Sequence, residues 1–127
     1  MNELPRVLVV EDSPTQSKAI AAQISRYEID VFIANDGPQG LRLASKHNPD
    51  LILLDINLPT MNGFQVCRRL KRDENTAHIP VIILTAADAL DDIKQGFEAG
   101  AANYITKDEF AAERLTLTLQ SMGLTSS

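Results

Sequence analysis

Three aliphatic runs without a single polar residue constrain the fold of this chain more than any other feature. They lie at residues 7–10, 51–54 and 81–84. A strand with one face in water alternates apolar and polar residues, whereas an uninterrupted run is typical of a parallel strand covered on both faces by helices. Two further strand-length segments lie at 31–33 and 104–105. We therefore predict a five-stranded sheet with the three uninterrupted runs at its centre.

Each of the five expected strands is followed by a segment whose apolar residues recur at helical spacing. The expected helices lie near residues 14–27, 38–47, 63–72, 90–99 and 111–122. Ser13-Pro14 is typical of a helix start, with serine as the N-cap and proline in the first turn. The last segment also alternates as a strand would, but Ala111, Leu115 and Leu119 form a helical stripe. Regular alternation of strand and helix predicts a three-layer, doubly wound α/β domain with a parallel sheet.

Length, charge and cysteine content exclude several classes of protein. A chain of 127 residues with 44% hydrophobic residues is the size of one domain with a packed core. Its net charge of -5 opposes direct binding of nucleic acid. Cys67 is the only cysteine, so it forms neither an internal disulfide nor a zinc cluster. No apolar run approaches the roughly 20 residues of a membrane helix. We expect one cytoplasmic domain over residues 1–127 that binds neither nucleic acid nor membranes.

Polar side chains follow four of the five expected strands. Glu11 and Asp12 come after the first strand, Asp55 after the third, Thr85 after the fourth and Lys107 after the fifth. The carboxyl ends of parallel strands meet at one edge of the sheet, where ligands of such folds bind. We therefore expect three carboxylates, a hydroxyl and an ammonium group to converge there.

This set of groups suits phosphoryl transfer. Three neighbouring carboxylates repel one another unless a cation lies between them, and Mg²⁺ prefers oxygen ligands of this kind. A carboxylate such as Asp55 can act as a nucleophile toward phosphorus. Thr85 and Lys107 would then neutralise the phosphoryl oxygens. Each residue alone also has an ordinary structural explanation. For example, the acids Glu11 and Asp12 precede a helix, whose dipole stabilises negative charge at its start. Their joint occurrence favours a site.

Four segments lie around the ends of the expected strands, namely Val7–Asp12, Leu53–Gly63, Ile83–Ala86 and Tyr104–Lys107. Together they resemble the receiver domain of bacterial two-component response regulators, and the resemblance extends over about residues 6–122. It implies a flavodoxin-like fold with strand order 2-1-3-4-5. It also implies a phosphoacceptor signalling protein rather than an enzyme, one that participates in its own dephosphorylation.

The resemblance assigns roles to particular residues. It implies that Asp55 accepts a phosphoryl group from a histidine kinase or phosphotransfer protein, and that Thr85 and Lys107 contact that group. The implied Mg²⁺ ligands are Glu11, Asp12, Asp55 and the backbone carbonyl of Asn57. Thr85 and Tyr104 would form the conformational switch. The implied output surface, which would bind a downstream protein, comprises residues 90–99, 103–106 and 110–122.

One position departs from the family pattern. Receivers usually have proline directly after the lysine, whereas this chain has Asp108. Since a non-proline cis bond costs about 2.5–4 kcal/mol, we predict a trans Lys107–Asp108 bond. We further predict that the Asp108 side chain caps the last helix, because aspartate is a good N-cap.

Other functions compatible with this fold class fit the sequence less well. A flavodoxin-like electron carrier needs an uncharged phosphate loop after the first strand, where this chain has two acids. The G-x-G-x-x-G loop of a dinucleotide-binding dehydrogenase is absent. A haloacid-dehalogenase-type phosphatase would have a second aspartate where this chain has Asn57. The alternative is a pseudo-receiver, a protein-binding module that takes no phosphate, and only Asp108 supports it. If the sequence is complete, the protein acts through protein contacts; if excised, its parent could be a transcription factor.

Overall fold

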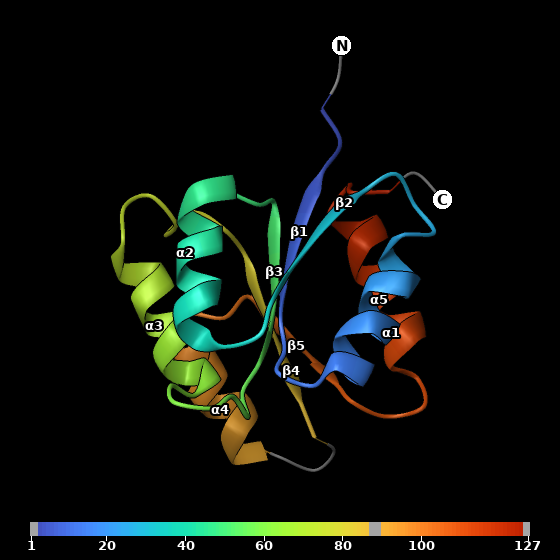
Figure 1. Cartoon of the computed structure of the whole chain (residues 1–127). Coiled ribbons are helices and arrows are strands. Elements are labelled where there is room, and N and C mark those ends of the chain that lie inside the picture. Colours follow the sequence, from blue (N-terminus) through green and yellow to red (C-terminus); the bar gives the residue numbers. More distant parts are fainter. Residues whose placement is uncertain (1–2, 87–89, 126–127) are drawn as a thin grey trace.

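The sheet has the predicted number, direction and order of strands. The computed structural model describes residues 3–86 and 90–125. Its strands are β1 (Arg6–Val10), β2 (Asp30–Ala34), β3 (Leu51–Asp55), β4 (Val81–Thr85) and β5 (Asn103–Thr106). All pair in parallel in the order β2-β1-β3-β4-β5 (Figure 1). The flavodoxin-like topology is confirmed, with the three uninterrupted runs in the middle.

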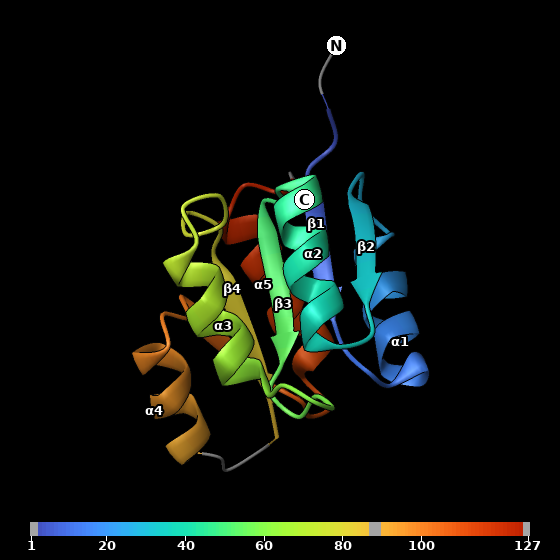
Figure 2. The same cartoon turned by 60° about the vertical axis from the view of Figure 1, so that its left-hand side comes forward.

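Five helices cover the two faces of the sheet. They are α1 (Pro14–Ile24), α2 (Gly37–His47), α3 (Gly63–Arg72), α4 (Leu90–Glu98) and α5 (Ala111–Ser121). α2, α3 and α4 lie on one face, whereas α1 and α5 lie on the other (Figures 1 and 2). The alternating segment at 115–119 is therefore helical, as its apolar stripe indicated. No helix in the described ranges has the length and apolar character needed to cross a membrane.

The central strands have no polar alternation because each of their faces packs against a different core. Leu8, Ile52 and Ile83 point into the core beneath α2, α3 and α4. Their neighbours Val9 and Leu53 point into the core beneath α1 and α5. Successive side chains of a strand face opposite sides, so both sets must be apolar.

Side-chain caps position the helices that border the carboxyl end of the sheet. The Ser13 hydroxyl accepts a hydrogen bond from the Gln16 N–H at 3.3 Å and so caps α1. Asn62 and Gln65 form a reciprocal capping box at the start of α3. Gly63 follows at once, and a Cβ there would lie 2.5 Å from the carbonyl oxygen of Asp55. Glycine therefore lets α3 begin directly against the end of β3.

The prediction for Asp108 is half right. The Lys107–Asp108 bond is trans, as expected. However, α5 begins at Ala111 with Phe110 as its N-cap residue and no side-chain cap. The Asp108 carboxylate instead accepts a hydrogen bond from the Phe110 N–H at 2.8 Å and pairs with Arg114 at 3.0 Å. This hydrogen bond lowers the pKa of Asp108, and the Arg114 charge adds to the effect. Asp108 closes the turn that leads into α5 because two further residues precede the first helical turn.

Candidate functional site

The polar residues expected at the carboxyl edge of the sheet do lie together there. Glu11 directly follows β1, Asp55 ends β3 and Thr85 ends β4. These three side chains are almost fully buried, with residue exposures of 1%, 3% and 1%. Asp12 is exposed beside them. The site is thus a buried polar pocket with one carboxylate at its mouth.

The three acids form a compact cluster. Glu11, Asp12 and Asp55 each offer one carboxylate oxygen, and these oxygens all lie within 4.8 Å of one another. Burial raises the pKa of Glu11 to about 7, helped by a hydrogen bond with Asp55 and by the charge of that residue. Lys107 acts in the opposite direction. Glu11 is therefore a carboxyl group that protonates near neutral pH unless a further cation compensates its charge.

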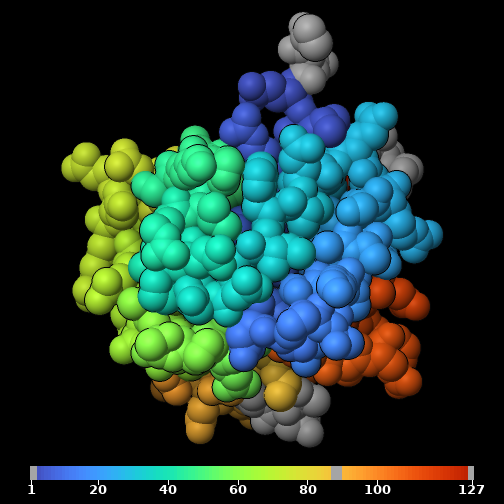
Figure 3. Space-filling model, in the orientation of Figure 1, coloured from blue at the N-terminus to red at the C-terminus, as the bar shows by residue number. Residues whose placement is uncertain are grey.

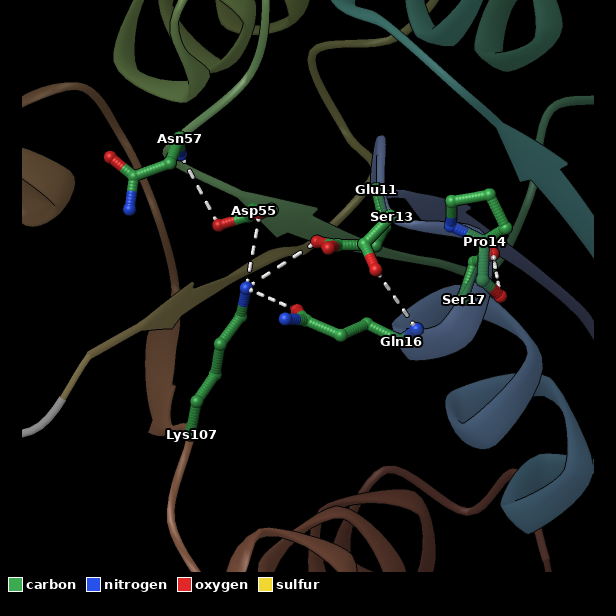
Figure 4. Close-up of polar contacts among 8 residues, drawn as sticks. All are labelled: Glu11, Ser13, Pro14, Gln16, Ser17, Asp55, Asn57 and Lys107. Atoms are coloured by element: carbon green, nitrogen blue, oxygen red, sulfur yellow. Dashed lines mark hydrogen bonds and ion pairs between the residues drawn. The ribbon is translucent and has the colours of Figure 1, made fainter.

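Lys107 bridges two of the acids, Asp55 and Glu11. Its Nζ lies 3.1 Å from Asp55 Oδ2 and 3.4 Å from Glu11 Oε2 (Figure 4). It also donates a hydrogen bond to the side-chain oxygen of Gln16 at 2.9 Å. The backbone N–H of Lys107 donates to the Thr85 carbonyl at 2.7 Å, which anchors the lysine beside the end of β4. With Asp108 in place of the usual proline, the lysine still reaches the site.

Gln16 is a member of this site that sequence reasoning missed. It lies in the first turn of α1, and Figure 4 shows its side chain extending toward Lys107. A polar residue three positions after the Ser13 N-cap, in the helix that follows β1, was the available signal. That signal is weak, since first-turn residues of most helices are solvated.

Asn57 and Thr85 complete the surroundings of Asp55. The backbone N–H of Asn57 donates to Asp55 Oδ1 at 3.2 Å and thereby orients the carboxylate. In Figure 4 the Asn57 side chain points away from the acids. The Thr85 hydroxyl donates to the carbonyl of Ala86 at 3.4 Å, a long hydrogen bond that leaves the hydroxyl easily redirected.

Tyr104 lies on β5, opposite Ile83 of β4 and two residues before the end of its strand. Its side chain does not reach the acid cluster. The ring instead packs edge-on against Phe97 of α4, with a centroid distance of 6.1 Å. The residue is 38% exposed. The structure thus places Tyr104 on the outer surface formed with α4.

The donor set fits a magnesium ion. Each of the three acids offers an oxygen donor, and the cluster carries more negative charge than Lys107 alone compensates. Mg²⁺ binds oxygen ligands and keeps several waters, so an open site with an exposed acid such as Asp12 suits it.

A family model agrees with this geometry. The model of the response regulator receiver domain matches residues 7–120. The chain belongs to this family. It is a receiver domain of two-component response regulators, and hence a signalling protein rather than a classical enzyme. Receiver domains bind Mg²⁺ in this acidic pocket and interact with histidine kinases or phosphotransfer proteins.

Two curated relatives illustrate the range of proteins that contain such a receiver. The chain is 46% identical over 104 residues to the DNA-binding dual master transcriptional regulator RpaA of Synechocystis, covering 82% of this chain and 43% of RpaA. It is 40% identical over 104 residues to protein PilH of Pseudomonas aeruginosa, covering 82% of this chain and 86% of PilH. The receiver thus spans less than half the length of RpaA but most of PilH.

A solved structure shows the same fold with a metal. The receiver domain of the sensor histidine kinase PA1611 from Pseudomonas aeruginosa has a magnesium ion coordinated in its active-site cleft. It matches this chain with a TM-score of 0.84 and 30% identity, covering 95% of this chain and 99% of that domain.

Proposed function

We propose that Asp55 of this receiver is the phosphoacceptor. The observation that carries the proposal is the position of its carboxylate, which is buried at the end of β3, 3.1 Å from the Lys107 ammonium and within the acid cluster. A buried carboxylate is costly unless it is paired. Glu11 and Asp12 lie in one cluster with Asp55, and the Lys107 ammonium contacts both Asp55 and Glu11, so the site offers both a place for a metal and a fixed positive charge.

The transfer step follows from this arrangement. An oxygen of the ionised Asp55 attacks the phosphorus of a phosphohistidine on a kinase or phosphotransfer protein. The new O–P bond forms as the P–N bond breaks, and the imidazole nitrogen leaves with the electron pair. Lys107 balances negative charge on the phosphoryl oxygens, and the Thr85 hydroxyl can turn from Ala86 to donate to one of them.

Mg²⁺ is the cofactor that the site would hold. Its proposed ligands are the carboxylates of Glu11, Asp12 and Asp55 and the backbone carbonyl of Asn57. When bound, the ion supplies additional positive charge at the phosphoryl oxygens and relieves the repulsion among the acids. The same pocket can return the protein to its resting state. Water attacks the phosphorus of the aspartyl phosphate, releasing inorganic phosphate and restoring the Asp55 carboxylate.

The output surface in this proposal is formed by α4, β5 and α5. Leu90, Phe97 and Tyr104 are large apolar side chains with exposures of 79%, 47% and 38%. When the Thr85 hydroxyl moves toward a phosphoryl oxygen, it vacates space on the strand next to β5, and the Tyr104 ring shifts inward. Phosphorylation thereby changes the population of two states of this surface. A downstream protein that binds one of the two states more tightly then responds to the phosphorylation of Asp55.

The proposal treats residues 1–127 as one receiver domain, with its structured core at about 6–122. Two continuous cores on either side of one sheet support this organisation. We place the domain in the cytoplasm, where histidine kinases present their phosphohistidine. Its direct partners are the kinase or phosphotransfer protein and the downstream target.

Labelling with a radioactive phosphohistidine donor tests the proposal. We expect incorporation that requires Mg²⁺ and is abolished in Asp55→Asn, which keeps the shape of the side chain but removes the nucleophilic charge. Unchanged labelling of that variant would refute the assignment of Asp55. Absence of labelling in the unmodified protein would favour a pseudo-receiver.

A second measurement addresses the switch. Beryllofluoride places a BeF₃⁻ group on Asp55 that stands in for the phosphoryl group. NMR shift changes should then extend from the acid cluster to α4, β5 and α5. Changes confined to the cluster would contradict the proposed coupling through Thr85 and Tyr104.

A further inference from the structure

A group of arginines lies on α3, outside the acid site. Arg68, Arg69 and Arg72 line a surface hollow of about 470 Å³. The remaining lining residues are Thr60, Met61 and Gln65. Gln65, Arg68, Arg69 and Arg72 follow the i, i+3, i+4, i+7 spacing of one helix face. Figure 3 shows α3, in green to yellow-green, at the surface beside α2.

No carboxylate in the described part of the chain neutralises the three guanidinium groups. Among the described residues, none of them forms an ion pair, whereas Arg6, Lys107 and Arg114 each pair with a carboxylate. The neighbouring Lys71 is different again, because its ammonium donates to the carbonyls of Ala77 and Ile79. The arginines are therefore a local positive surface on a chain whose net charge is -5.

Stability of α3 does not account for this cluster. Basic residues in the last turn interact favourably with the helix dipole, but one or two suffice and the effect is limited to that turn. Like charges one turn apart, as at Arg68 and Arg72, repel each other and destabilise a helix. Repulsion among the arginines thus offsets part of the dipole's stabilisation, and a negatively charged partner would relieve that repulsion.

The loop that borders the hollow has an unusual backbone conformation. Thr60 has a φ of 67°, in the left-handed region that β-branched residues rarely adopt. Such conformations persist where the surroundings enforce them and are concentrated at functional sites. Here the conformation sets Thr60 and Met61 at the edge of the arginine cluster, where they add a hydroxyl and an apolar contact.

We propose that this face of α3 binds an acidic segment of a partner protein. Each guanidinium group can bind a carboxylate by donating two parallel hydrogen bonds. Arg68 and Arg72 are separated by about 6 Å along the helix axis, which matches carboxylates one turn apart on a partner helix. A nucleic acid fits less well, because its many phosphates would meet the negative charge of the rest of the domain. None of the residues that line the hollow belongs to the acid cluster or to α4, β5 and α5.

A labelled glutamate octapeptide provides the test. Its binding to the unmodified protein is measured by fluorescence anisotropy at low and moderate salt. The variant R68Q/R69Q/R72Q removes the cluster while keeping side chains with good helix propensity. The matched control is K18Q/R26Q/K46Q, which makes the same change in net charge at exposed positions on α1, just after α1 and on α2. Circular dichroism establishes that both variants are folded.

We expect the α3 variant to bind the peptide about tenfold more weakly or worse, as loss of charge-assisted hydrogen bonds predicts, while the control stays within about twofold. Binding should also weaken as salt increases. Equal losses in both variants would overturn the proposal, because they would report net charge alone. So would no binding of the peptide, or binding of tripolyphosphate in its place, which would indicate a site for phosphates rather than for an acidic protein segment.

Discussion

The two helical layers of this receiver pack against the same sheet in different ways. In the α2–α3–α4 layer, glycines allow close approach: a Cβ on Gly37 would lie 2.8 Å from a methyl carbon of Val66. In the α1–α5 layer, a hollow of about 360 Å³ remains between the two helices. Its lining includes Leu53 and Leu84 of the sheet and Lys107 at the acid site.

This difference matters for the site. The closely packed layer holds Asp55, since α3 begins at Gly63 directly against the end of β3. The looser layer borders Lys107, which we propose contacts the phosphoryl group, and its partner Gln16; both of them line the hollow. The closely packed layer thus holds Asp55, the proposed acceptor, in place, whereas the looser layer leaves space beside the Lys107 side chain.

Leucine truncation in each layer should produce the largest effects. Leu70 of α3 is 1% exposed in the closely packed core, and Leu115 of α5 is 5% exposed and lines the hollow. We expect Leu70→Ala to lower the free energy of unfolding by about 4 kcal/mol and Leu115→Ala by about 2 kcal/mol, because the second side chain has fewer contacts to lose. Urea denaturation of the two variants measures both values. Equal losses would contradict the contrast between the layers.

The pH dependence of stability should report the proton on Glu11. The pKa of Glu11 is about 7 in the folded protein against an ordinary value of 4.5. The folded state therefore binds this proton more tightly than the unfolded state, and the stabilisation it brings is complete below about pH 4.5 and disappears as the pH rises through 7. The loss should reach about 3 kcal/mol without Mg²⁺.

Glu11→Gln is the control for that titration, because the amide cannot ionise. Its stability should be nearly flat over the same pH interval in urea denaturation. Hydrogen exchange should locate the loss near α1 and α5, since Lys107 joins Glu11 to the segment before α5. A pH dependence that persists in Glu11→Gln would assign the proton elsewhere.

Magnesium should stabilise the protein through the exposed acid of the cluster. At ten times its dissociation constant, a ligand that binds only the folded state adds about 1.4 kcal/mol. We expect Asp12→Ala to remove most of this gain, because Asp12 is the exposed acid at the mouth of the pocket. Glu28→Ala, at an exposed position outside the cluster, should keep it. Thermal unfolding with and without Mg²⁺ distinguishes the two, and equal behaviour would argue against the proposed ligand set.

Filling the hollow should have the smallest effect. Ala112 lines it, and methionine is flexible enough to occupy an irregular space. Ala112→Met should raise the free energy of unfolding by about 0.5 kcal/mol. The exposed Ala22 of α1 is not among the lining residues, and Ala22→Met should leave stability unchanged. A gain of the same size in both variants would show that filling the hollow is not its cause.

Local patterns were sufficient to predict most of the fold. The uninterrupted aliphatic runs predicted the central strands, and Ser13-Pro14 predicted the start of α1, because each signal depends on residues within one turn or one strand. The convergence of Glu11, Asp55, Thr85 and Lys107 also followed from the sequence, since parallel strands present their carboxyl ends at one edge.

Other features depend on contacts between distant parts of the chain. The ammonium of Lys107 meets Glu11 across 96 residues and Gln16 across 91, and no local pattern encodes such pairs. Asp108 closes a turn instead of capping the helix because α5 begins only at Ala111, and the sequence did not reveal that starting point. The sequence by itself thus determined which elements form and which residues reach the rim. Only the tertiary structure decided which groups pair there and where space remains beside Lys107. Burial, charge and packing at the rim depend on several helices and strands at once, and these come together only when the chain folds.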